Sequence, residues 1–97
     1  MELEELIQSD KPTLVEFTSP GCTLCNMQKS VLDQVAEYYG DKVNVEVREA
    51  LMGSPIEKQF TIMAAPTNIL FKNGQQVWRH NDFAGLDRLK NAINENL

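Results

Sequence analysis

The sequence predicts an α/β domain in which a mixed four-stranded sheet is covered by helices on both faces. Short apolar segments typical of strands alternate with segments of helical periodicity along the chain. A long helical segment separates the first two predicted strands, so these strands should be parallel with a right-handed crossover. Asn73-Gly74 marks a tight hairpin, so the last two strands should be antiparallel. At 97 residues, we expect positions 1–97 to form one domain.

The first predicted strand covers residues 13–18 and follows a short helix over residues 2–8. Pro12 favours extended geometry in the residue before it, which ends this helix. The strand is almost continuously apolar, as expected for a strand that is covered on both faces. Glu16 is the exception. A buried carboxylate there would be costly, whereas at a sheet edge the side chain would reach water.

The longest predicted helix runs from residue 23 to residue 39, where apolar residues recur at steps of three and four. Gly40 is a suitable terminator. The residues expected to face the sheet are Leu24, Met27, Val31, Val35 and Tyr38. Those assigned to the other faces are Gln28, Lys29, Asp33, Gln34 and Glu37. Met27, like the later Met63, is interpreted as a packing residue rather than a metal ligand.

The second half of the chain alternates in the same way. Valines at every second position predict a strand over residues 43–48. Ser54-Pro55 then combines an N-cap with proline at the first helical position, which predicts a short helix to about residue 60. Residues 68–71 and 76–80 should form the antiparallel hairpin. Apolar residues from 86 to 97 then predict a closing amphipathic helix.

Charge and hydropathy exclude several functions. The formal net charge is −5 and the basic residues are scattered, which argues against nucleic-acid binding. No apolar run approaches the roughly 20 residues that a membrane span needs. The first residues are acidic and lack the pattern of a secretory signal, so we expect a cytoplasmic protein that does not bind membranes.

The only two cysteines, Cys22 and Cys25, fall between the first strand and the long helix. Unpaired N–H groups and the positive end of the dipole at a helix N-terminus favour the thiolate, which is the nucleophilic form. Two cysteines separated by two residues can also close a small ring and so cycle between dithiol and disulfide. Burial as a pair of small apolar side chains is the alternative, and the position at a helix start argues against it.

Taken together, these features resemble the thioredoxin family. The resemblance covers essentially the whole chain. It depends on Cys-x-x-Cys at a strand-to-helix junction, on Ala65-Pro66-Thr67 before a strand about 40 residues later, and on Phe71-Lys72-Asn73-Gly74 just beyond. It implies a thioredoxin-like fold that is shortened at the N-terminus, because the usual first strand of the family is missing.

The resemblance also implies roles for single residues. Cys22 matches the exposed attacking thiol and Cys25 the resolving thiol. Glu16 matches a buried acid that helps the second thiol lose its proton. Pro66 matches the family's cis-proline, which sits against the disulfide.

Substrate binding is expected at four positions. The backbone of Ala65 matches the site that pairs with an extended substrate segment, next to Pro66. Gly21 directly precedes the first cysteine, and Gly85 is expected to match the glycine that keeps the substrate groove open.

Several residues depart from the family's commonest pattern. That pattern has tryptophan before the first cysteine and Gly-Pro between the two, whereas this chain has Gly21 and Thr23-Leu24. Asn26 replaces the usual cation after the second cysteine, and Val47 falls where a lysine opposite Glu16 is expected. The dipeptide between the cysteines strongly influences reduction potential in the family, so reductant, oxidant and isomerase roles stay open.

The resulting prediction is a thiol-disulfide oxidoreductase that reduces disulfides of protein partners as a monomer, without a bound cofactor. An external reductase such as a thioredoxin reductase would supply the electrons. One alternative is a zinc or copper site, which would need further ligands from a partner because two thiolates fill only half of a tetrahedral shell. The other is a redox-inactive interaction module with the same fold.

Overall fold

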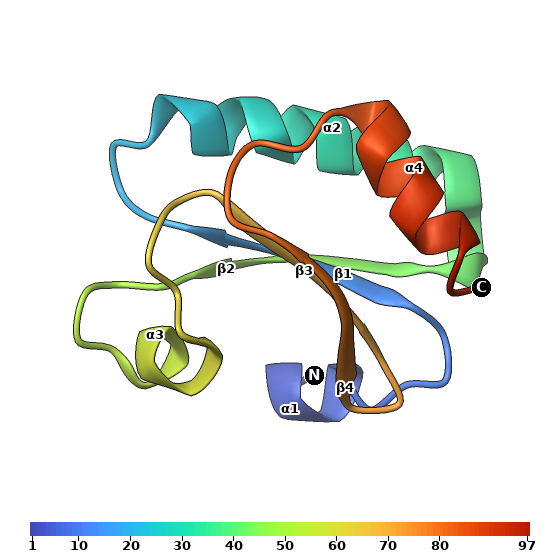
Figure 1. Cartoon of the computed structure of the whole chain (residues 1–97), viewed down its shortest axis with the longest axis horizontal. Helices are drawn as coiled ribbons and strands as arrows, with labels where there is room; N and C mark the ends of the chain where they lie inside the picture. The colour runs from blue at the N-terminus through green and yellow to red at the C-terminus, as the bar shows by residue number, and fades with distance from the viewer.

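The computed structural model describes the whole chain, residues 1–97, as one sheet with helices on both faces (Figure 1). The elements are, in chain order, α1 Leu3–Leu6, β1 Thr13–Thr18, α2 Thr23–Tyr39, the 3-10 helix η1 Gly40–Lys42, β2 Asn44–Glu49, α3 Pro55–Phe60, β3 Thr67–Lys72, β4 Gln75–His80 and α4 Leu86–Asn94. The strands lie in the order β2-β1-β3-β4. The predicted fold class, a mixed four-stranded sheet with helices on both faces, is confirmed, and β1 is the first strand of the described chain.

The strand directions follow from the connections between them. β1 and β2 are parallel, and the long helix α2 makes the crossover. β1 pairs with β3, and β3 with β4, in antiparallel fashion. The strand β1 is therefore hydrogen-bonded on both edges. This central position agrees with its sequence, which is the most continuously apolar of the predicted strands.

Two hydrophobic clusters cover the two faces of the sheet. Figure 1 shows α2 and α4 on one face and α1 and α3 on the other. Leu14 packs in the cluster under α2 and α4, while Val15 and Phe17 pack in the cluster on the side of α1 and α3. Because side chains alternate along a strand, Glu16 lies on the same face as Leu14, under α2.

The β3–β4 hairpin turns at Asn73 and Gly74, both of which have positive φ, 53° and 79°. Positive φ at two successive residues is what a tight hairpin turn requires, and asparagine and glycine tolerate it best. The turn is fastened to the α1–β1 connection, because the Gly74 amide donates to the Ile7 carbonyl at 2.9 Å. A side chain at Gly74 would also collide with Gln8, 2.6 Å away.

The predicted buried face of α2 is correct for Val35, and for Val31 in part, but wrong for the other three residues. The residues that face the sheet are Cys25, Gln28, Leu32, Val35 and Tyr39. Leu24, Met27 and Tyr38, which were expected to be buried, are 45%, 52% and 59% exposed. Cys25 points toward the sheet, so residues three and four positions apart from it line the inner face. Apolar residues occur on both sides of this helix, so periodicity alone does not identify the side that is buried.

The ends of the other helices agree better with the sequence. The Ser54 hydroxyl accepts a hydrogen bond from the Glu57 amide at 3.2 Å, and the Glu57 carboxylate accepts one from the Gly53 amide at 2.8 Å. The predicted N-cap of α3 is therefore confirmed. Helix α4 ends at Asn94, before the predicted Leu97. None of the helices is both long enough and apolar enough to span a bilayer.

Two leucine truncations test the observed face of α2. Leu32 is 1% exposed, so Leu32→Ala should lower the free energy of unfolding by about 2–5 kcal/mol through the cavity it leaves. Leu24→Ala, on the exposed side, should change it by less than about 1 kcal/mol. Urea unfolding of the oxidised protein measures both values. A larger loss for Leu24→Ala would restore the face that the sequence predicts.

Candidate active site

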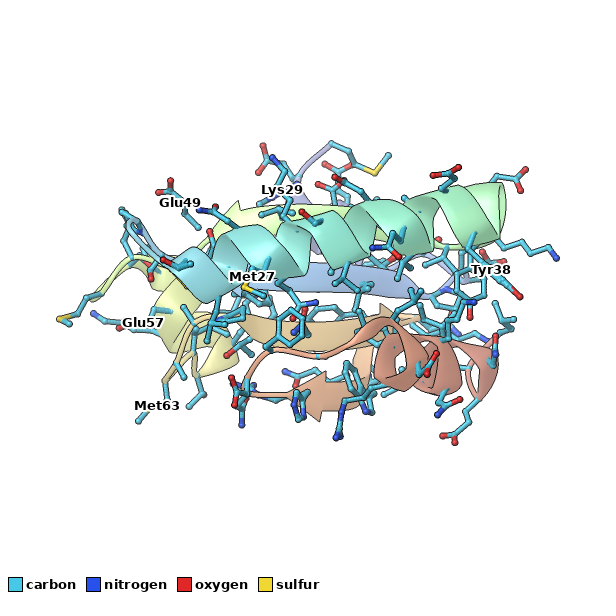
Figure 2. The ribbon with its side chains drawn as sticks, turned by 90° about the horizontal axis from the view of Figure 1, so that it is seen from above. Met27, Lys29, Tyr38, Glu49, Glu57 and Met63 are labelled. Atoms are coloured by element: carbon cyan, nitrogen blue, oxygen red, sulfur yellow. A yellow bond between two sulfur atoms is a disulfide. The ribbon has the colours of Figure 1, made fainter.

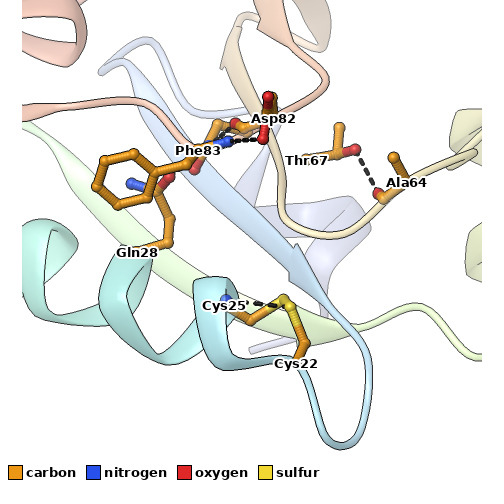
Figure 3. The surroundings of a disulfide bond; sticks show 8 residues. Cys22, Cys25, Gln28, Ala64, Thr67, Asp82 and Phe83 are labelled. Atoms are coloured by element: carbon orange, nitrogen blue, oxygen red, sulfur yellow. Dashed lines mark hydrogen bonds between the residues drawn. A yellow bond between two sulfur atoms is a disulfide. The ribbon is translucent and has the colours of Figure 1, made fainter.

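The two cysteines meet in a disulfide at the start of α2 (Figure 3). Cys22 is the N-cap residue, and its Sγ accepts a hydrogen bond from the Cys25 amide at 3.1 Å. Gly21, with φ of 72°, makes the turn that brings the chain from β1 into the helix. Cys22 is half-buried while Cys25 is only 3% exposed. The expectation that the second cysteine is the more covered one is confirmed.

This placement gives the two sulfur atoms different chemistry. The first sulfur lies over the N-terminal amides of α2, where the helix dipole and an N–H donor favour a negative charge after reduction. It is also the sulfur that a partner can reach. The second sulfur is enclosed by the sheet and the helix, so it can act only on a group that is already attached to the first.

The loop before β3 lies beside the disulfide. The Ala65–Pro66 peptide bond is cis, and Pro66 is buried while Ala65 is half-buried. Ala64 and Thr67 belong to the surroundings of the disulfide drawn in Figure 3, and the Thr67 hydroxyl donates to the Ala64 carbonyl at 2.7 Å. Cys22, Cys25 and the cis-proline loop are thus brought together at one end of the sheet.

Glu16 is fully buried, and neither oxygen of its carboxyl has a hydrogen-bond partner. In the sheet register it lies between Val47 on β2 and Asn68 on β3, so it does not sit at an edge. Burial raises the pKa of the Glu16 carboxyl from its usual 4.5 to about 7, against the opposing effect of Lys29. The carboxyl can therefore exchange a proton near neutral pH.

Lys29 supplies the cation that the sequence analysis could not place. It follows Cys25 by one helical turn and lines a cavity of about 260 Å³ together with both cysteines and Val47. Figure 2 shows Lys29 along the same edge of the molecule as Glu49, which lies at the end of β2. The expected strand position is indeed apolar, and the helix provides the charge instead.

Gln28 and Asn68 form a buried polar cluster that the sequence analysis missed. Gln28 Nε2 donates to the Ala84 carbonyl at 2.9 Å, and its Oε1 accepts from the Ala84 amide at 2.7 Å. Asn68 Nδ2 donates to Gln28 Oε1 at 3.0 Å and to the Asp82 carbonyl at 3.1 Å. These bonds hold the β4–α4 loop against α2, one turn from Cys25. Gln28 follows Cys25 by three residues and so shares its face of the helix, which is the feature of the sequence that could have indicated its burial.

Arg79 fixes the loop on the other side of the disulfide. From β4 it donates to the Phe60 and Thr61 carbonyls at the end of α3, both at 2.6 Å, and to Asn81 Oδ1 at 2.7 Å. The bidentate contact satisfies carbonyls that have no partner within the helix. It connects the segment that leads to Pro66 with the start of the β4–α4 loop.

Gly85 lies at the other end of that loop. It is the N-cap residue of α4, and its carbonyl accepts from the Leu89 amide at 3.1 Å. The loop residues drawn around the disulfide in Figure 3 are Asp82 and Phe83. A contribution of Gly85 to a substrate groove stays a prediction.

Apolar side chains stand exposed around this end of the molecule. Met27 and Met63 are 52% and 86% exposed, so their interpretation as packing residues is wrong. Figure 2 shows them on α2 and on the segment after α3. No group of three or more His, Cys, Asp or Glu side chains is placed to hold a metal ion.

Comparison with known proteins settles the family. The family model described as Thioredoxin matches residues 2–95. The chain belongs to the thioredoxin family. It is 42% identical over 74 residues to the thioredoxin of Alicyclobacillus acidocaldarius, which covers 76% of this chain and 70% of that protein. It is 32% identical over 92 residues to the thioredoxin of Haemophilus influenzae, which covers 95% of this chain and 86% of that protein.

Solved structures agree with this assignment. The thioredoxin of Malassezia sympodialis superposes with a TM-score of 0.78 at 26% identity, over 96% of this chain and 81% of that one. Thioredoxin-2 of the malaria parasite has a TM-score of 0.82 at 24% identity, over 88% of this chain and 82% of that one, and supports the fold. As a thioredoxin-family protein with a Cys-x-x-Cys pair, the chain is a protein-disulfide oxidoreductase.

The carboxyl of Glu16 should make stability depend on pH. Between pH 4.5 and 7 the folded protein holds a proton on Glu16 that the unfolded chain releases, so stability falls as pH rises through this range. The loss should reach about 3 kcal/mol. Glu16→Gln removes the titrating group and should flatten this part of the curve.

Urea unfolding of both oxidised proteins from pH 4 to pH 9 measures the effect. The remaining acidic residues titrate equally in both proteins, so the difference between the two curves belongs to Glu16. Parallel curves would show that Glu16 titrates normally.

Proposed function

We propose that the protein reduces disulfides in protein partners through a cycle of Cys22 and Cys25. The observation that carries the proposal is the different exposure of three groups in the site. The half-buried sulfur of Cys22 caps α2, and the sulfur of Cys25 is covered. The carboxyl of Glu16, which has no hydrogen-bond partner, is buried in the strand under α2. Each group is suited to one step of thiol-disulfide exchange.

In the first step the Cys22 thiolate attacks one sulfur of a substrate disulfide. A bond forms between Cys22 and that sulfur, and the other substrate sulfur leaves as a thiolate. In the second step Cys25 loses its proton to the Glu16 carboxylate and attacks Cys22. The enzyme disulfide forms, and the second substrate sulfur leaves as a thiolate that takes a proton from water.

We assign substrate binding to the backbone on both sides of the disulfide. Ala65 lies outside β3, and none of the backbone hydrogen bonds of turns and loops involves it. Its N–H and carbonyl can therefore pair with an extended substrate segment, as an added strand pairs with a sheet edge. Gly21 has no side chain that would obstruct such a segment, and Pro66 has no N–H that would need a partner there.

An external reductase, such as a thioredoxin reductase, would return electrons to the disulfide after each cycle, and no bound cofactor takes part. We propose that the protein acts as a monomer in a reducing compartment such as the cytoplasm, where a reversible dithiol of this kind is useful.

Turnover and trapping test the proposal together. With dithiothreitol as electron source, the protein should accelerate the reduction of insulin, and Cys22→Ser should abolish the acceleration. Cys25→Ser should retain attack by Cys22 but accumulate the mixed disulfide with insulin, because no second thiol releases it. Mass spectrometry of the non-reduced mixture identifies the adduct. If the wild-type protein does not accelerate insulin reduction and the Cys25→Ser variant traps no adduct, the protein is an inactive interaction module and the proposal is wrong.

The reduction potential of the pair then decides the direction of electron flow. Equilibration with glutathione or dithiothreitol should give a value near about −270 mV, as for a reductant. A value near about −120 mV would identify an oxidant and contradict the reducing role.

A glutamine at position 16 should separate the two chemical steps. Glu16→Gln keeps the size of the side chain but cannot accept a proton, so release of substrate by Cys25 should slow by about 10²-fold while attack by Cys22 changes little. In the wild type, release should also slow as pH falls below about 7, where Glu16 is already protonated. Stopped-flow fluorescence and quenched-flow alkylation measure the two rates. Equal slowing of both steps would remove the role of Glu16.

A further inference from the structure

Three buried side-chain polar atoms have no hydrogen-bond partner, and all three belong to one cross-strand pair. They are the two carboxyl oxygens of Glu16 and the Oδ1 atom of Asn68. The two residues are opposite each other in the antiparallel register of β1 and β3, and both are 0% exposed. Buried polar atoms rarely lack partners, so three at one pair call for a physical explanation.

The orientation of the Asn68 amide is fixed by its surroundings. Its two N–H groups have two acceptors, Gln28 Oε1 at 3.0 Å and the Asp82 carbonyl at 3.1 Å. Turning the amide over would place its oxygen against these two acceptor atoms. Gln28 is held in turn, because it both donates to and accepts from the backbone of Ala84. Asn68 Oδ1 is therefore a fixed, buried acceptor that lacks a donor.

We propose that Asn68 is a positioning residue for the Glu16 proton: the protonated carboxyl of Glu16 donates its O–H to Asn68 Oδ1. Opposed residues of an antiparallel pair have Cβ atoms about 4.5–5.5 Å apart, within reach of these two side chains. A carboxylate has no donor to offer, so while Glu16 lacks its proton neither Asn68 Oδ1 nor a carboxyl oxygen can form this hydrogen bond. The hydrogen bond exists only while Glu16 carries the proton.

This inference rests on the proposed function, in which Glu16 accepts the proton of Cys25. During release of the substrate, the S–H bond of Cys25 breaks and an O–H bond forms on Glu16. The new O–H then donates to Asn68 Oδ1. The acceptor thus stabilises the product of the proton transfer and not the starting carboxylate.

Other charged groups act on the same carboxyl. The titratable groups nearest the pair in the register, the cavity and the loop beside it include Lys29 on α2, Glu46, Arg48 and Glu49 on β2, Arg79 and His80 on β4, Asp82 in the β4–α4 loop, and the two cysteines. Lys29 favours the carboxylate, in opposition to Asn68. Of the two residues paired with Glu16 in the sheet register, Val47 is apolar and only Asn68 offers an acceptor, so replacement of Asn68 should change the vibration of the protonated acid.

Infrared difference spectra of the oxidised protein between pH 5 and pH 9 test the hydrogen bond without any turnover. The C=O stretch of protonated Glu16 is identified by its loss in Glu16→Gln. In the wild type it should lie at the lower frequency of a carboxylic acid whose O–H donates a hydrogen bond. In Asn68→Leu it should shift up to the frequency of an unbonded acid, and release of substrate by Cys25 should slow by about tenfold.

Gln28→Leu is the matched control. It breaks both contacts to Ala84 and one of the two contacts of Asn68 Nδ2, but it leaves Asn68 Oδ1 in place and keeps the hydrogen bond to the Asp82 carbonyl that holds the amide. Its C=O band should stay at the wild-type frequency. Asn91→Leu, on the exposed side of α4, should also leave the band unchanged.

Three results would overturn the inference. The first is a C=O band of Glu16 that lies at the frequency of an unbonded acid in the wild type. This result does not depend on whether any variant folds. The second is an unshifted band in Asn68→Leu, and the third is an equal shift in Gln28→Leu and Asn68→Leu, which would assign the effect to the loop. Because the spectrum is recorded on the resting disulfide, these results are independent of whether the protein reduces insulin.

Discussion

A carboxyl group buried in the central strand without a hydrogen-bond partner is the constraint on which the rest of the site depends. β1 is paired on both edges and covered by α2, so Glu16 has no route to water and its charged form is disfavoured. At the end of the same strand, the N-terminus of α2 favours a negative charge on Cys22. The surroundings of the two groups thus act in opposite directions on their ionisation, as the proposed roles of nucleophile and proton acceptor require.

The positive charge that acts on the Glu16 carboxyl comes from helix α2 and not from the neighbouring strand β2. Val47 occupies the strand position next to Glu16, so β2 contributes no charge there. Lys29 reaches the cavity from α2 instead, four residues after Cys25. A cation on the exposed rim of the cavity lowers the pKa of Glu16 only partly, because water screens it, and burial remains the larger effect.

Most of the backbone could be predicted from the sequence, because local signals determine it. The Asn73-Gly74 turn and the apolar strand over residues 13–18 each have one favourable structure. The face of α2 could not be predicted in this way, since both sides of the helix carry apolar residues. On the exposed side, Leu24 and Met27 lie in the first turns of α2, close to the cysteines, and remain uncovered. Gln28 was missed for the converse reason: its polarity indicates exposure, whereas its partners lie far away in the sequence.

The buried amides are a consequence of the path that the β4–α4 loop takes. The Ala84 amide and carbonyl and the Asp82 carbonyl pass under α2 without a strand to pair with, and such backbone groups must be satisfied. Gln28 and Asn68 satisfy them, so replacing either amide with leucine would add apolar contact but leave backbone groups unpaired. Gln28 uses both of its polar atoms in these contacts, whereas Asn68 uses only its nitrogen and has one polar atom left over. In Asn68 that atom is Oδ1, and the sheet register places it opposite the one buried acid of the chain.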